Sequence, residues 1–203
     1  MNSPKSSLSL SQTSVSAEDN NVYLIASEAE GLLIDAADNP VAIEALAKDA
    51  GVRITAILTT HRHWDHVRAL PSIIDTTGAT HYASFLDAPA LPAPVDVELH
   101  HGDILPFAGE KFEVSILRGH TPGGVCLAVP LDGVIHLFLG DSLFPGGVGH
   151  TVNESDFSRL FNDVKTRVFD VYPDDTVVHP GHGLPTTLGA ERPHLEEWRQ
   201  RGW

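Results

Sequence analysis

The chain has 203 residues, enough for one domain with a substantial core, and no apolar stretch reaches the length of a membrane-spanning helix. Asp and Glu number 27 against 13 Lys and Arg, which gives a formal net charge of −14. This balance repels phosphate backbones and anionic membranes, so we expect neither a nucleic acid nor a membrane as partner. The single cysteine, Cys126, excludes a disulfide within this sequence and indicates a reducing compartment, for which we expect the cytoplasm.

The N-terminal segment is rich in Ser and Thr and has no apolar core of signal-peptide length. We therefore expect residues 1–17 to form a disordered tail, followed by a single domain over residues 18–203. The apolar runs 22–26 and 32–34 predict a hairpin at the start of that domain. Asn39 and Pro40 then predict the beginning of a helix that ends near Gly51.

Residues 54–60 form a short β-branched apolar run that is typical of a buried strand. We expect a helix after it, which Pro71 divides or kinks. Further helices are predicted over about 155–168, from apolar residues at helical spacing, and over 191–201. The remaining expected strands are residues 80–85, 104–107, 111–117, 125–129, 134–139 and 176–179. This order predicts an α/β (α+β) fold in which two sheets pack together with helices outside.

The most informative motif is His61-x-His63-x-Asp65-His66, which places four metal-binding groups within six residues. In an extended stretch, residues two apart point the same way, so His61 and His63 can bind one ion together. Asp65 and His66 follow at a predicted turn and can bind a second ion beside the first. The motif comes directly after the strand 54–60, and the carboxyl ends of strands are where α/β folds place their chemistry.

Three more metal-binding side chains follow predicted strands. His120 and His182 are each preceded or flanked by Gly, which lets an imidazole project from a loop. Asp141 follows an apolar strand directly; alone it would read as a turn residue, but beside the other groups it predicts a ligand. Of the neighbouring residues, Trp64 is expected to pack against its loop, and His150 can reach a substrate pocket. The alternative is a structural metal site in a non-catalytic binding module, although such sites are usually closed and rich in Cys.

In these motifs the chain resembles the hydrolases of the metallo-β-lactamase fold, whose ligand motifs it matches in order from Asp35 to His182. Among the subgroups it most resembles the glyoxalase II-like (hydroxyacylglutathione hydrolase-like) thioester hydrolases, because residues 140–149 are similar to their Gly-Asp-x-Leu-Phe segment. The resemblance implies an αββα four-layer sandwich.

The resemblance also implies two divalent metal ions. The first would be held by His61, His63 and His120, and the second by Asp65, His66 and His182. Asp141 would bridge the two ions, and Asp35 would support the cluster from behind. Zinc suits a mixed set of imidazole and carboxylate ligands, and iron and manganese are compatible with it.

The implied function is a dinuclear metal-dependent hydrolase that attacks a thioester or related ester carbonyl with a metal-bound hydroxide. Asp65, which would orient the nucleophile or handle its proton, and Asp141 are the catalytic candidates. The expected substrate is a small acyl-thiol or ester. Glutathione specificity is not supported, because no Lys lies beyond Lys165 and only about twenty residues follow His182.

Two other reactions remain open at this stage. A lactone hydrolase shares the complete ligand set. A persulfide dioxygenase uses a single iron on the equivalents of His61, His120 and Asp141. The sequence does not specify an oligomeric state.

Overall fold

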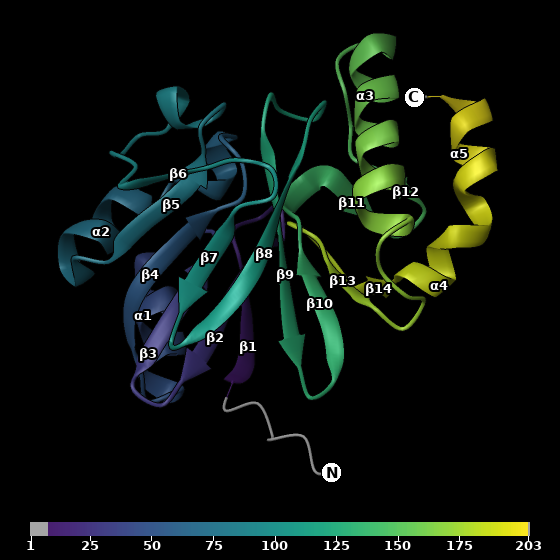
Figure 1. Cartoon of the computed structure of the whole chain (residues 1–203). Coiled ribbons are helices and arrows are strands. Elements are labelled where there is room, and N and C mark those ends of the chain that lie inside the picture. Colours follow the sequence, from purple (N-terminus) through teal and green to yellow (C-terminus); the bar gives the residue numbers. More distant parts are fainter. Residues whose placement is uncertain (1–7, 203) are drawn as a thin grey trace.

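Two six-stranded β-sheets form the centre of the computed structural model, which describes residues 8–202 (Figure 1). The strands of the first sheet follow one another in chain order, from β1 to β6. They are β1 (Leu8–Val15), β2 (Asn20–Ser27), β3 (Glu30–Ile34), β4 (Arg53–Thr59), β5 (Thr80–Ser84) and β6 (Val97–Leu99). β1, β2 and β3 pair antiparallel, whereas β3 to β6 pair parallel.

The second sheet has the order β14-β13-β10-β9-β8-β7. Its strands are β7 (Ile104–Phe107), β8 (Glu110–Leu117), β9 (Gly124–Leu131), β10 (Val134–Phe138), β13 (Val177–His179) and β14 (Thr186–Thr187). β10 and β13 run parallel, so their carboxyl ends lie at the same edge of the sheet. The short strands β11 (Leu143–Phe144) and β12 (Gly147–Val148) pair with each other.

Helices cover the outer face of each sheet (Figure 1). α1 (Pro40–Asp49) and α2 (Leu70–Thr77) lie on the first sheet, and α3 (Glu154–Val164) and α5 (Leu195–Arg201) lie beside the second, with α4 (Leu188–Glu191) between β14 and α5. The strands alternate accordingly: Leu32 and Ile34 belong to the core between the sheets, and Leu33 packs with α1. The result is the expected αββα four-layer sandwich.

The disordered tail predicted for residues 1–17 is wrong where the structure describes it. Residues 8–15 form β1, which pairs with β2 along its whole length from Leu8 to Val15. Leu8 and Leu10 pack on the core between the sheets, while Ser9 between them is exposed. β1 is an edge strand with one buried face, so a Ser/Thr-rich composition is compatible with it. The folded part therefore begins no later than Leu8, and residues 1–7 lie outside the described part.

The predicted strands and helices otherwise occur close to their expected places. Pro71 divides its segment: a short 3₁₀ turn, Trp64–His66, precedes α2, and the proline lies in the first turn of that helix. The C-terminal helix begins earlier than predicted and is interrupted by a 3₁₀ turn at Arg192–His194. Among residues 8–202, no helix is both long enough and apolar enough to cross a membrane.

Candidate metal centre

The seven predicted ligands come together where strands of both sheets end. His61 and His63 follow β4, and Asp65 and His66 lie in the 3₁₀ turn after them. The other three lie in loops of the second sheet: His120 between β8 and β9, Asp141 after β10, and His182 between β13 and β14. Residues that are up to 121 positions apart in the chain thus share one site, because the loops that carry them lie where strands of the two sheets end.

His61, His63 and His120 form the first group. Their ring centroids lie 4.9 Å apart for His61 and His63, 5.0 Å for His61 and His120, and 4.5 Å for His63 and His120. One nitrogen of each ring can be chosen so that the three nitrogens lie within 4.8 Å of one another. Three imidazoles at this spacing are able to hold a single metal ion.

Asp65, His66 and His182 form the second group, which is tighter. His66 Nε2 lies 3.1 Å from His182 Nε2, and Asp65 Oδ2 lies 3.4 Å and 3.2 Å from these two nitrogens. Ligands about 2.0–2.1 Å from a zinc ion in tetrahedral geometry are about 3.3 Å from one another. The spacing of these three atoms fits such an ion.

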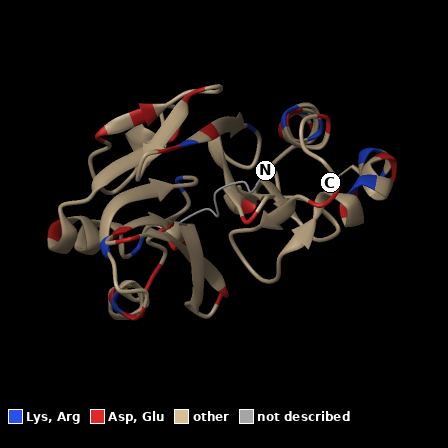
Figure 2. Ribbon diagram, turned by 60° about the horizontal axis from the view of Figure 1, so that its bottom comes forward, with Lys and Arg blue, Asp and Glu red and all other residues tan. Residues whose placement is uncertain are grey.

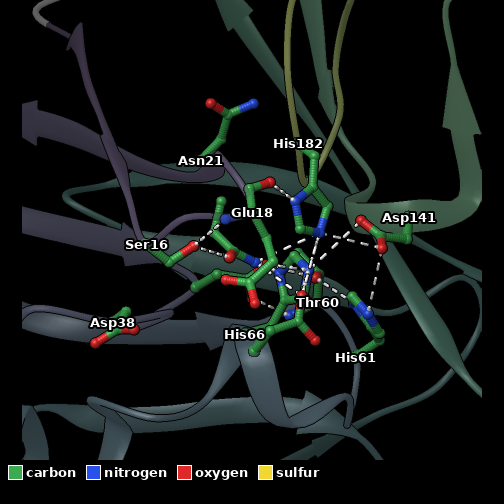
Figure 3. Close-up of polar contacts among 12 residues, drawn as sticks. Ser16, Glu18, Asn21, Asp38, Thr60, His61, His66, Asp141 and His182 are labelled. Atoms are coloured by element: carbon green, nitrogen blue, oxygen red, sulfur yellow. Dashed lines mark hydrogen bonds and ion pairs between the residues drawn. The ribbon is translucent and has the colours of Figure 1, made fainter.

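The carboxylate of Asp141 faces both groups (Figure 3). Its Oδ2 lies 3.9 Å from His61 Nε2 and 3.5 Å from His120 Nε2, on the side of the first group. It also lies 3.5 Å from His182 Nε2, and Oδ1 is 3.5 Å from His66 Nε2. Asp141 therefore approaches imidazoles of both groups from the side on which their Nε2 atoms lie.

Two of the imidazoles are held by backbone carbonyl groups. His120 Nδ1 donates to the carbonyl oxygen of His150 across 2.7 Å, and His182 Nδ1 donates to that of Glu18 across 2.7 Å (Figure 3). A carbonyl oxygen can only accept, so the proton of each ring is on Nδ1 and the lone pair of Nε2 faces the site. Metal-binding histidines are typically oriented in this way.

The other anchors form a buried network around Asp35. Its Oδ2 accepts from His66 Nδ1 across 2.9 Å and from the Thr60 hydroxyl across 2.7 Å, and its Oδ1 accepts from the Thr60 amide across 2.7 Å. The Thr60 oxygen in turn lies 3.0 Å from His61 Nδ1, from which it can accept. Asp35, His61 and His66 also have atoms close enough to form a third possible metal group. The Asp35 carboxylate is already occupied by these hydrogen bonds, which hold His66 and Thr60 in place.

The arrangement leaves buried acceptors without partners. His61 Nε2 and His120 Nε2 are buried and have no hydrogen-bond partner among the described residues, and the buried Asp141 Oδ1 has only a distant neighbour in His66 Nε2, at 3.5 Å. Buried polar atoms without partners are rare and costly, and these three atoms face the two groups. A cation among these atoms would satisfy them, so the residues fit a metal centre.

The charges of the site also favour a cation. Burial lowers the pKa of His61 well below its ordinary value, so its imidazole is neutral. Burial would raise the pKa of Asp141, but hydrogen bonds from His182 and His66 outweigh it and hold that pKa far below the ordinary range. The hydrogen bond to Asp141 raises the pKa of His182. Burial disfavours charge on His66, yet its bonds to Asp141 and Asp35 raise its pKa to about 10. In the absence of metal, His66 therefore holds a proton that a metal ion would displace.

Several contributors to the site are absent from the sequence-based prediction. Asn20, at the start of β2, is fully buried, and its side-chain amide nitrogen lies 2.9 Å from Asp65 Oδ2. The carbonyl groups of Glu18 and His150 carry no sequence signal, because every residue has one. The prediction for Trp64 is wrong: its side chain is 63% exposed instead of packed against the loop.

The comparisons with known proteins agree with this geometry. A profile of the metallo-beta-lactamase superfamily matches residues 15–182, and the chain belongs to this superfamily. The hydroxyacylglutathione hydrolase of Fuscovulum blasticum is 34% identical over 173 residues, which are 81% of this chain and 63% of that relative. The chain thus spans less than two thirds of the length of this glyoxalase II relative.

Solved structures show the same fold. One protein whose crystal structure was solved in a di-iron-bound form is 32% identical in sequence to this chain. The two structures match with a TM-score of 0.74, over 89% of this chain and 96% of that one. The BLEG-1 B3 metallo-beta-lactamase has a TM-score of 0.81 at 24% identity, covering 92% of this chain and 97% of that one, and supports the fold alone.

Proposed function

We propose that this protein is a dinuclear metal-dependent hydrolase that cleaves a small thioester or related ester. The observation that carries the proposal is the position of Asp141, whose carboxylate approaches imidazoles of both groups. A carboxylate shared between two neighbouring sets of donors is the arrangement that a pair of ions requires. A closed structural site holds its ion in a four-coordinate set of its own and needs no shared carboxylate.

The proposed ligand set has one group of residues for each ion. The first ion would be held by His61, His63 and His120, the second by Asp65, His66 and His182, with Asp141 between them. Zinc suits these donors, and iron or manganese is compatible with them. When bound, such ions supply a water of lowered pKa and a Lewis acid for the carbonyl oxygen.

The residues of the chain contribute orientation and proton handling. Hydrogen bonds from Nδ1 hold the imidazoles of His66, His120 and His182 so that each Nε2 faces the site. The side chain of Asp65 is 26% exposed, so its carboxylate is accessible at the edge of the site. We propose that Asp65 orients the attacking water and accepts its proton, and that Asp141 is the other catalytic residue.

The comparisons support a thioester as the substrate. The relative from Fuscovulum blasticum is named a hydroxyacylglutathione hydrolase, a thioester hydrolase by that name. Because the chain spans only 63% of that relative, we propose a small acyl-thiol as the substrate without specifying its thiol part. A protein similar to this one was solved in a di-iron-bound form, which supports the presence of two ions.

The charge of the surface also favours a small substrate. The net charge is −14, and Asp and Glu are distributed over the whole ribbon with Lys and Arg interspersed among them (Figure 2). We propose that neither nucleic acid nor an anionic membrane is a partner, because both would be repelled.

A panel of substrates tests the proposal. Purified protein whose metal content has been measured would be assayed with acyl-thiols, lactones, a cephalosporin and a persulfide. We expect the highest kcat/KM with an acyl-thiol, and loss of that activity after chelation and its return with added Zn²⁺, Fe²⁺ or Mn²⁺. Preference for a lactone would reassign the substrate within the same chemistry. Oxygen uptake with the persulfide at one iron per chain would replace the hydrolase with a dioxygenase.

A further inference from the structure

The side chain of Asn20 lies at the centre of the second group. It is fully buried at the start of β2, and its Nδ2 lies 2.9 Å from Asp65 Oδ2. The same nitrogen lies 3.4 Å from His66 Nε2 and 3.4 Å from His182 Nε2. One amide group thus approaches all three donor atoms that the second ion would use.

The hydrogen bonds around Asn20 define which end of its amide faces the site. The hydroxyl of Ser16 donates to Asn20 Oδ1 across 2.6 Å, which leaves the NH₂ group toward Asp65. An ionised carboxylate only accepts, so the NH₂ end is the one that can bond to it. The opposite orientation would place the Asn20 oxygen against the oxygen of Asp65.

The turn between β1 and β2 also holds His182. The carbonyl group of Glu18 accepts from His182 Nδ1 (Figure 3). Asn20 and His182 also form an isolated antiparallel bridge. The side-chain amide of Asn21 donates to the carbonyl groups of Pro180 and Gly183, on either side of His182. Residues 16–21 therefore contact two of the three donors of the second group through the same short segment.

We propose that Asn20 is a positioning residue for the second metal ion: its side-chain N–H fixes Asp65 Oδ2 at the spacing from His66 and His182 that the ion requires. The inference rests on the proposed function. It gives the β1–β2 turn a specific role, because this turn supplies both the amide that holds Asp65 and the carbonyl group that holds His182. The three imidazoles of the first group receive no contact from Asn20 in the described hydrogen bonds, so its effect is confined to the second ion.

The experiment is a titration of metal-free protein with Co²⁺, followed by d–d absorption and by calorimetry. Wild-type protein is expected to bind two ions. Asn20→Leu keeps a similar volume but has no N–H, and we expect it to bind the second ion about 10–100-fold more weakly while binding the first as wild type does. At saturating Co²⁺ its d–d bands should keep the wild-type intensity, because the ligands themselves are unchanged.

Two further variants keep the inference falsifiable. Ser16→Ala removes the hydroxyl that donates to the Asn20 amide and accepts from the backbone amide of Glu18. It should weaken binding of the second ion in the same direction but less, and it stands in for Asn20→Leu if that variant does not fold. Ser27→Ala is the control with the same substitution as Ser16→Ala, because Ser27 is buried at the other end of β2 from Asn20. We expect it to lower the melting temperature with less than a threefold change in Co²⁺ affinity.

The outcomes separate this inference from the proposed function. If wild-type protein binds one Co²⁺ or none, the dinuclear function itself fails. If it binds two and Asn20→Leu binds the second ion equally well, or Ser27→Ala weakens binding of the second ion as much as Asn20→Leu does, Asn20 has only a structural role. If the d–d bands of saturated Asn20→Leu change intensity, Asn20 is a ligand and not a positioning residue.

Discussion

Asp35 and His66 are joined by a buried hydrogen bond, in which His66 Nδ1 donates to Asp35 Oδ2 across 2.9 Å. The same carboxylate accepts from the hydroxyl of Thr60, whose oxygen lies 3.0 Å from His61 Nδ1. Asp35 therefore connects an imidazole of the first group with one of the second, although it faces neither proposed ion directly. It couples the orientation of the two halves of the site.

Asp35→Asn should disturb both groups at once. The amide is isosteric but neutral, and one end of it presents donors where the carboxylate accepted three hydrogen bonds. We expect metal affinity or kcat to fall about 10–100-fold. The free energy of unfolding should fall by about 1–3 kcal/mol, because buried donors lose their partners. The measurements are metal titration and urea unfolding; wild-type metal affinity in this variant would contradict a supporting role for Asp35.

Gly181 lies against the shared carboxylate. A Cβ atom at this position would lie 2.1 Å from Asp141 Oδ1 and 2.7 Å from His66 Cε1. Gly181→Ala should therefore displace Asp141 and reduce both metal content and turnover by at least tenfold.

Gly183 offers a control in the same loop. A Cβ atom there would meet nothing within 4 Å, and only its φ of +68° opposes substitution. Gly183→Ala should cost about 1 kcal/mol of stability and leave the metal content unchanged. Equal metal loss in both variants would show that the loop, and not the contact with Asp141, determines binding.

The seven proposed ligands were predictable from the sequence because side-chain chemistry and position were both visible. His61 and His63 alternate at a strand end, and Asp141 follows an apolar strand directly. The anchors behind them were only partly predictable. Asp35 was expected from the resemblance. The carbonyl group of Glu18 could not be predicted, because every residue has one and only the tertiary structure places this one beside His182.

β1 and Asn20 were missed for a related reason. The Ser/Thr-rich composition of the first residues concealed the alternation of Leu8 and Leu10, which pack on the core between the sheets. An edge strand with one buried face has few apolar positions, so composition is a poor guide to it. With no strand expected before it, nothing in the sequence marked Asn20 as a group held against Asp65.

His179 gives the stability of the fold a pH dependence. Burial, together with nearby His136, lowers its pKa from 6.5 to about 4, while its ring stacks on Phe138. The unfolded chain takes up this proton near pH 6.5 and the folded chain only near pH 4. The free energy of unfolding should therefore decrease as the pH falls from 6.5 to 4, by at most about 1.4 kcal/mol per pH unit, with no further loss from this group below pH 4.

His179→Phe removes the titrating group and keeps a flat ring in the stack. Urea unfolding of metal-free protein between pH 4.5 and 7 should show a smaller slope for this variant than for wild type. Equal slopes would mean that His179 takes up its proton at the same pH in the folded and the unfolded chain.

Trp64 is exposed between two proposed ligands, His63 and Asp65. An indole at this position offers apolar contact area to the acyl part of a substrate. Trp64→Ala should raise KM for acyl-thiols severalfold with a smaller effect on kcat, and change stability by no more than about 0.5 kcal/mol. A large loss of stability with unchanged KM would instead indicate that the ring packs on the protein in solution.

The central claim is that the residues around Asp141 hold two metal ions, and the most direct measurement is the number of ions per chain. Protein reconstituted with zinc and freed of excess metal would be analysed by inductively coupled plasma mass spectrometry beside Asp141→Ala. We expect close to two ions per wild-type chain and at least one fewer in the variant. One ion or none in wild type, or two retained without the carboxylate of Asp141, would contradict a dinuclear centre bridged by this residue.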